Sequence, residues 1–144
     1  MIPGLDPDAM AGRLNAAGAP YGIEFGRRET VANSRLALEA AEFARDHGRY
    51  DELHGQLFAA YFQEGRNIGE LETVLQVAGG AGLDTAALRQ ALARGVYRER
   101  LDVAREQGRA CQVTGLPTFI LNGAAKIVGA QRYDVFAGAV GQFL

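Results

Sequence analysis

Apolar residues recur at intervals of three or four along most of the first 110 positions of the chain. This interval is the spacing of one face of an α-helix, so it predicts a largely helical N-terminal portion. Polar residues and glycines interrupt the pattern at places that are typical of helix ends. Together they predict six helices, which begin near residues 7, 34, 50, 69, 85 and 96.

Three polar residues stand where a helix N-terminus needs a side-chain hydrogen-bond acceptor. Asp6 opens the first helix, Asn33 the second and Asp84 the fifth. Gly48 and Gly95 follow the last turns of the second and fifth helices, where a left-handed backbone conformation is common. We therefore expect these three helices to begin at a capping side chain, and two of them to end at a glycine.

Two of the predicted helices should differ in how much of their surface is buried. The third, over residues 50–65, has large apolar residues at helical spacing and is predicted to bury them. These residues are Leu53, Leu57, Phe58, Tyr61 and Phe62. The sixth, over residues 96–110, is strongly charged and only weakly amphipathic, so we expect most of its surface to lie in water.

The hydrophobic pattern changes near residue 118. "TFILNGAAKIV" (118–128) is rich in β-branched and aromatic residues and contains Asn122-Gly123, the strongest short signal for a β-hairpin. A last helix is predicted over residues 132–144, with an apolar stripe that includes Val135, Phe136 and Val140. A two-stranded hairpin is marginal by itself in water, so this one must pair with or pack against something more. "YGIEF" (21–25) is the one other candidate strand.

Length, charge and cysteine content limit the classes of protein to which this chain can belong. The 144 residues suit one domain, and the formal net charge of −2 argues against a nucleic acid or an anionic membrane as partner. No apolar run is long enough to span a bilayer, and the first residues lack a secretory signal. The single cysteine excludes an intramolecular disulfide and favours a cytoplasmic location. His47, His54 and Cys111 lack the spacing of a zinc site, so no metal is expected.

The stretch "VTGLPTFILNG…VGAQRYDVF" (113–123 and 128–136) resembles the C-terminal part of DsbA-like thioredoxin-fold proteins. The match is to the FrnE type in particular, which is related to 2-hydroxychromene-2-carboxylate isomerase. Residues 31–84, with "AYFQEGRNIG" as their most distinctive part, resemble the helical insert of the same group. The resemblance implies a mostly helical α/β chain with an incomplete thioredoxin-like fold. It would be a single domain fragment with a helical insert over about 30–110 and a ββα portion over about 111–144.

The resemblance also implies which residues meet a substrate. In this family a proline in the cis form enters the strand, and the main chain beside it holds an extended substrate next to a Cys-x-x-Cys dithiol. The corresponding residues here are Leu116, Pro117 and Thr118. The family's first strand, dithiol and second strand have no counterpart in this sequence, so we expect a truncated or degenerate member. Cys111 is the only candidate thiol, and its place after a helix C-terminus favours a structural role.

Three functions remain open at this stage. The first is a thiol–disulfide oxidoreductase relative that acts on protein thiols or disulfides, without dithiol activity in this chain. The second is a non-catalytic interaction module that forms a homodimer through the exposed edge of its hairpin. The third is a relative of glutathione-dependent isomerases or transferases, in which Asn33 would be a candidate ligand contact and glutathione the one candidate cofactor.

Overall fold

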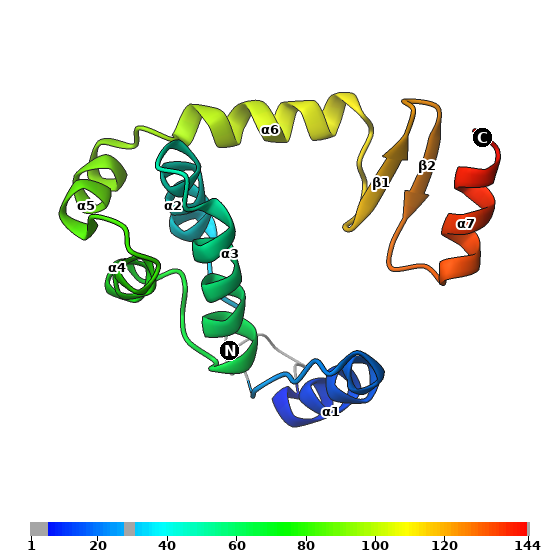
Figure 1. The fold of residues 1–144 in the computed structure, drawn as a ribbon, viewed down its shortest axis with the longest axis horizontal. Coiled ribbons are helices and arrows are strands. Elements are labelled where there is room, and N and C mark those ends of the chain that lie inside the picture. The colour runs from blue at the N-terminus through cyan, green and yellow to red at the C-terminus, as the bar shows by residue number, and fades with distance from the viewer. Residues whose placement is uncertain (1–5, 28–30, 144) are drawn as a thin grey trace. The chain divides into compact units, whose positions relative to one another are not determined.

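The computed structural model describes residues 6–27 and 31–143, and it divides into two compact units with the boundary between Leu101 and Asp102. The first unit is helical, and the second contains the larger part of one helix, a β-hairpin and a last helix (Figure 1). The chain crosses the boundary within a helix, α6, which spans Arg98–Ala110.

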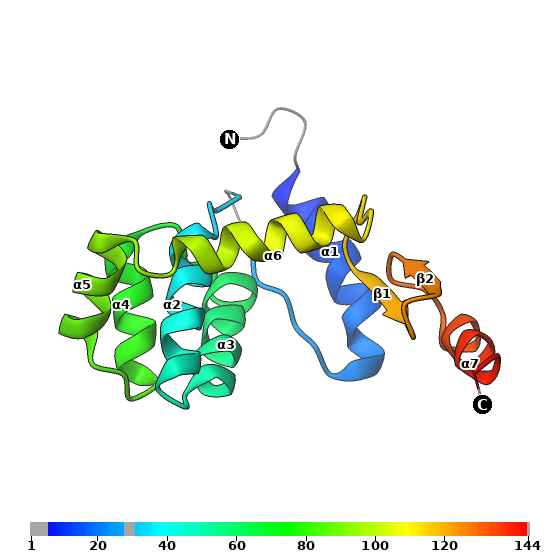
Figure 2. The ribbon, with the colours of Figure 1, turned by 90° about the horizontal axis from the view of Figure 1, so that it is seen from above.

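Five α-helices lie within the first unit, close to the predicted positions. They are α1 (Pro7–Gly18), α2 (Arg35–Asp46), α3 (Tyr50–Phe58), α4 (Leu71–Gly80) and α5 (Thr85–Arg94). A short 3₁₀ helix, η1 (Ala19–Tyr21), follows α1, and a π-helical turn, η2 (Ala59–Gln63), continues α3. Helices α2 to α5 lie side by side and enclose the core of this unit (Figure 2).

The core of the first unit is built from alanines and a few large aliphatic side chains. Alanines on α2 let α3, α4 and α5 approach closely, and Phe43 fills the space near the end of α2. The large apolar side chains that are completely enclosed are Leu53, Val74 and Leu88, one from each of the three neighbouring helices. Side chains so enclosed each contribute about 1.5–3 kcal/mol to folding.

Residues close in the sequence set several of the predicted helix ends. The Asp6 carboxylate accepts the N–H groups of Asp8 and Ala9 at 3.0 and 3.1 Å, which confirms it as the cap of α1. Asp84 caps α5 in the same way. Gly48 and Gly95 take left-handed conformations with φ of 66° and 65°, as predicted.

The start of α2 differs by one residue from the prediction. Ser34 occupies the cap position and makes no side-chain capping bond. The bond comes from one residue earlier, because the Asn33 Oδ1 accepts the N–H of Arg35 at 3.1 Å. Asn33 therefore supplies the capping interaction from just outside the cap position.

The predicted burial of Phe58 is wrong, since 53% of its side chain is exposed. Phe58 belongs to a row of rings four residues apart on α3 and η2, which also contains Tyr50, His54 and Phe62. Consecutive ring centroids in this row are 5.2, 4.7 and 5.4 Å apart. The core-facing side of α3 is the one that carries Leu53 and Leu57, so the ring row remains at the surface.

Charged side chains hold the first turn of α6 against α2. Arg100 donates two hydrogen bonds to the Asp46 carboxylate, at 2.8 and 3.0 Å, and the Tyr97 hydroxyl donates a third at 3.1 Å. Arg98 lies 3.9 Å from the Glu39 carboxylate. No residue of α6 is buried among those that the structure describes, as expected for a helix that lies largely in water. These contacts therefore attach α6 to the helical unit by ionic and polar interactions.

Glu39 is the one buried charged residue of the described chain, with 1% of its surface exposed. Its Oε1 accepts a hydrogen bond from the Arg35 Nε at 3.0 Å. Its Oε2 has no hydrogen-bond partner among the described residues. Both Arg35 and Arg98 thus approach the same oxygen of this carboxylate.

The second unit contains β1 (Thr118–Leu121), β2 (Ala125–Val128) and α7 (Tyr133–Gly141). The strands are antiparallel, with Phe119 opposite Ile127. Asn122 and Gly123 have φ of 50° and 68°, so the predicted hairpin turn is confirmed. Helix α7 contacts the hairpin through Phe136, whose ring meets that of Phe119 edge-to-face at 4.8 Å.

Burial is much lower in the second unit than in the first. Ile127, at 7% exposed, is the only buried apolar residue in its described part. The apolar stripe predicted for the last helix is present, yet Val135, Val140 and Phe143 are all exposed. A single helix covers one side of a two-stranded hairpin and leaves much of its own surface in solvent.

We predict that Asp46 makes stability depend on pH. The hydrogen bonds from Arg100 are the largest influence on the pKa of Asp46 and lower it, and the Tyr97 hydroxyl adds to the effect. A lowered carboxyl pKa stabilises the fold above the unfolded pKa of about 4, and this contribution is lost as pH falls through the folded value.

Asp46→Asn should therefore lower the urea midpoint at pH 7, and the difference from the original chain should close below about pH 4. Arg100→Gln should produce the same convergence, because it removes the partner of the same carboxylate. Urea unfolding followed by circular dichroism from pH 7 to pH 2 measures both. Midpoints that stay equally far apart at every pH would contradict this assignment.

Candidate functional site

The loop that leads into β1 presents one residue prominently to solvent. Leu116 is 87% exposed and is joined to Pro117 by a cis peptide bond. Two hydrogen bonds fix the main chain of this loop, one on each side of Leu116. The Thr118 hydroxyl donates to the Gly115 carbonyl at 2.6 Å, and the Gly129 N–H donates to the Pro117 carbonyl at 2.7 Å. The hairpin thus fixes the main chain around Leu116 while the residue itself remains accessible.

Leu116, Pro117 and Thr118, the residues that the family resemblance implies meet a substrate, therefore lie in one continuous stretch that leads into β1. Pro117 is bonded across the hairpin to the residue after β2, and Thr118 is the first residue of β1, opposite Val128. The strand pairing determines where Leu116 lies within this unit. An exposed main chain held in this way can donate and accept hydrogen bonds with an extended polypeptide.

Cys111 lies just beyond the end of α6 and is a free, exposed thiol. Its N–H donates to the Gln107 carbonyl at 2.9 Å, and its carbonyl accepts a hydrogen bond from the Lys126 Nζ at 2.5 Å. Lys126 also reaches the Gln112 carbonyl at 3.3 Å. The main chain of Cys111 therefore helps to attach the end of α6 to β2.

Asn33 belongs to the first compact unit, whereas Leu116 belongs to the second. Its side chain is used at the start of α2, and its main chain lies against Gly69. A Cβ at Gly69 would be 3.0 Å from the Asn33 carbonyl, which leaves little space beside it. The interactions of Asn33 that the structure describes are structural.

The two histidines each lie against aromatic rings. His47 stacks on Phe43 with centroids 4.0 Å apart, and its Nδ1 is 2.7 Å from the Phe43 carbonyl. His54 belongs to the ring row on α3. Across residues 6–27 and 31–143, no three His, Cys, Asp or Glu side chains are grouped in a way that could hold a metal ion. Within the same residues, no helix has both the length and the apolar character needed to cross a membrane.

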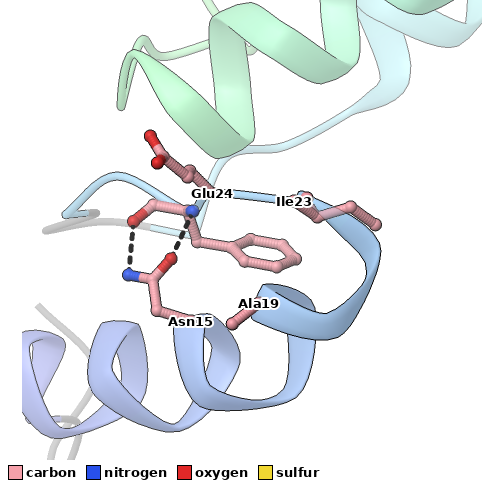
Figure 3. A pocket seen from close by; sticks show the side chains of 6 residues that line it. Asn15, Ala19, Ile23 and Glu24 are labelled. Carbon is pink, nitrogen blue, oxygen red and sulfur yellow. Dashed lines mark hydrogen bonds between the residues drawn. The ribbon is translucent and has the colours of Figure 1, made fainter.

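The structure also contains a surface hollow that the sequence pattern did not indicate. It measures about 490 Å³ and is lined by Asn15, Ala19, Gly22, Ile23, Glu24 and Phe25 (Figure 3). The Asn15 amide pairs with both main-chain groups of Phe25, at 2.9 and 2.7 Å. The pairing holds residues 23–26 in an extended path, and the Gly26 N–H donates to the Phe62 carbonyl at 2.8 Å.

This hollow has the volume of a small-molecule site but lacks the usual set of converging polar groups. The Asn15 amide is already bonded to Phe25, and Glu24 is the one charged residue among the described residues of the lining. The glycine at position 22 was the one signal in the sequence, because its positive φ reverses the chain after η1. Leu116 and its loop are therefore the better candidate site.

Comparisons with known proteins identify a family and two relatives. The model of the DsbA-like thioredoxin domain matches residues 6–141. The uncharacterized protein YwbO of Bacillus subtilis (strain 168) is 36% identical over 109 residues, which cover 73% of this chain and 52% of that protein. The crystal structure of the probable DsbA oxidoreductase SCO1869 from Streptomyces coelicolor superimposes with a TM-score of 0.82 at 26% identity. That match covers 93% of this chain and 58% of the other. The chain thus spans a little over half the length of these relatives.

Proposed function

We propose, from the premise that this chain belongs to the DsbA-like thioredoxin domain family, that it carries the substrate-holding side of a thiol–disulfide oxidoreductase. The family and its mostly helical fold, both predicted from the sequence, are confirmed by the family and structural matches. The FrnE type stays a prediction. The observation that carries the proposal is the exposure of Leu116 in a loop fixed by the Pro117–Gly129 and Thr118–Gly115 hydrogen bonds.

The chemistry divides into two tasks. A thiolate attacks a substrate disulfide and forms a mixed disulfide, and a second thiol then resolves it. A separate element holds the substrate main chain so that the sulfur is within reach. The 144 residues contain one cysteine, so a complete dithiol cycle has no second thiol within them. We assign the holding task to Leu116, Pro117 and Thr118.

Leu116 suits this task because its surroundings leave it accessible and its position well defined. Main-chain pairing with an extended peptide depends little on the peptide's side chains, so it suits an enzyme that acts on many unfolded proteins. Each such hydrogen bond contributes about 1 kcal/mol. The bonds at Gly115, Pro117 and Thr118 reduce the conformational entropy lost when the peptide binds.

We predict that the 144-residue chain does not catalyse insulin reduction. In the presence of dithiothreitol, insulin should precipitate at the uncatalysed rate, because a single thiol cannot complete the exchange cycle. Turbidity at 650 nm measures the precipitation, which takes on the order of minutes to hours. Cys111→Ser should give the same trace. Clear turnover that disappears in this variant would contradict the proposal and identify Cys111 as a nucleophile.

We further predict that the loop binds unfolded polypeptide. Titration of the ¹⁵N-labelled chain with reduced and carboxamidomethylated insulin B chain should shift the Leu116 amide resonance, and the resonance of Leu14 should not move. Leu116→Pro removes this N–H and should weaken binding several-fold, since one hydrogen bond contributes about 1 kcal/mol. Leu116→Ala keeps the N–H and should bind nearly as well. Equal binding by the two variants would exclude main-chain pairing at this residue.

A second candidate function is a non-catalytic interaction module that forms a homodimer. It is favoured by the apolar surface of the second unit, where Ile120 and Val128 are each 42% exposed on β1 and β2. Val135 and Val140 of α7 are also exposed. Exposed apolar surface next to a strand edge that no described residue covers is typical of a surface that binds another chain.

We predict that the purified chain is a dimer in solution. Size-exclusion chromatography with light scattering should give about twice the mass of 15.4 kDa, and the mass should fall on dilution if the pairing is reversible. The measurement is made with dithiothreitol, so that a Cys111 disulfide cannot produce the dimer. A monomer at every concentration would exclude this second function and leave the first one unaffected.

A further inference from the structure

Helix α6 ends at a residue other than glycine in the left-handed conformation. Gln112 has a φ of 53°, and its N–H donates to the Arg109 carbonyl at 2.8 Å. The Val113 N–H then donates to the Gly108 carbonyl at 2.9 Å and closes the last turn. Glycine is the usual residue at this position, because a side chain disfavours the left-handed conformation. Another residue keeps this conformation where neighbouring contacts hold it.

Lys126 of β2 provides such a contact. Its Nζ donates to the Cys111 carbonyl at 2.5 Å and to the Gln112 carbonyl at 3.3 Å. One ammonium group thus binds the two peptide groups that flank the Cα of Gln112. The last carbonyls of a helix lack partners within the helix, and the negative end of the helix dipole attracts a cation. Lys126 therefore supplies these carbonyls with a donor from another element.

Lys126 also belongs to the hairpin that carries the candidate site. It lies opposite Ile120 in the ladder, and the next residue, Ile127, is buried opposite Phe119. Successive side chains of a strand point to opposite faces, so Lys126 and Ile127 extend in opposite directions. Phe119 contacts α7 on the face of Ile127. The hairpin thus packs against α7 on one face, and from the other face Lys126 reaches the end of α6.

The contact of Lys126 fixes one end of a short loop whose other end is already fixed. Residues 113–117 connect α6 with β1 and include the exposed Leu116. Two hydrogen bonds beside Pro117 attach the part of the loop nearest β1 to the hairpin. Among the hydrogen bonds of the described residues, those of Lys126 are the ones that attach the other end, at Gln112, to the same hairpin.

We propose that Lys126 is a positioning residue for the substrate-holding loop, because its ammonium group attaches the end of α6 to β2 and so keeps the Leu116 main chain in place for an extended polypeptide. This inference rests on the proposed function and adds a residue outside the stretch 116–118. A peptide pairs with the ordered form of the loop, so the apparent affinity falls with the fraction of molecules in which the loop is ordered. Lys126 raises this fraction without contact with the peptide.

The order of the loop is measured first, on the ¹⁵N-labelled chain without peptide. In Lys126→Met the order parameter of the Leu116 N–H should fall from about 0.85 to below about 0.6, the values of rigid and flexible main chain. Lys126→Arg keeps a cation with several donors and should retain the higher value. Arg105→Met is a matched control, since it removes a positive charge that pairs with Asp102 within α6, and it should also retain the higher value.

The hairpin should remain folded in these variants, because Lys126 is exposed and methionine keeps most of the length of its stem. Nuclear Overhauser signals between Phe119 and Ile127 check this, and Lys126→Gln takes the place of Lys126→Met if they are lost. Loss of the hairpin in both variants would show a role in folding and overturn the proposal. An unchanged order parameter with an intact hairpin would overturn it too, as would a fall in Arg105→Met.

Peptide binding is the second measurement. Lys126→Met should bind reduced and carboxamidomethylated insulin B chain several-fold more weakly than the original chain, and Lys126→Arg should bind it about as tightly. Equal binding by Lys126→Met and the original chain would overturn the positioning role and leave the proposed function intact. An original chain that binds no peptide would instead overturn the proposed function, and the role of Lys126 with it.

Discussion

The antiparallel pairing of β1 with β2 is the interaction on which the candidate site depends. It places the Gly129 N–H against the Pro117 carbonyl and thereby fixes the main chain next to Leu116. The same alternation of hydrogen bonds directs the groups of Thr118 and Ile120 outward. One ladder of four residue pairs therefore sets both the accessible loop and the direction of the outward groups of β1.

The two compact units are stabilised to very different degrees by burial. Helices α2 to α5 surround a core with completely enclosed side chains, whereas the described part of the second unit buries only Ile127. Full burial of one large aliphatic side chain is worth about 1.5–3 kcal/mol. Covering the half-exposed Ile120 and Val128 would thus add on the order of 1–3 kcal/mol to a hairpin that is marginal alone. Contact with a partner would therefore stabilise the second unit more than the first.

Local chemistry explains which parts of the fold were predictable. Asp6 and Asp84 cap their helices, and Asn122-Gly123 turns the hairpin, because each acts on main-chain groups within three residues. The predictions failed where contacts with residues far away in the sequence determine the structure. Phe58 is exposed because no described element covers the outer side of α3, and the pattern of apolar residues could not reveal this. The hollow beside Asn15 depends on a side chain that bonds to a residue ten positions away.

At the candidate site, too, the sequence alone could not show which contacts each residue makes. The family resemblance implied Leu116, Pro117 and Thr118 as the residues that meet a substrate, and in the structure they form the end of a loop and the first residue of β1. Asn33 was harder to assign, because a polar residue before a helix suits both a cap and a ligand contact. Its hydrogen bond with Arg35 and its close approach to Gly69 favour the structural role. Only the surrounding contacts could distinguish the two.

The two candidate functions use neighbouring parts of the second unit. A peptide held at Leu116 uses the loop before β1, whereas a second copy of the chain would cover exposed apolar side chains such as those of Ile120 and Val140. The main-chain groups of Leu116 are not needed for that apolar contact. The two functions are therefore compatible in their hydrogen bonds and compete only for the volume beside Leu116.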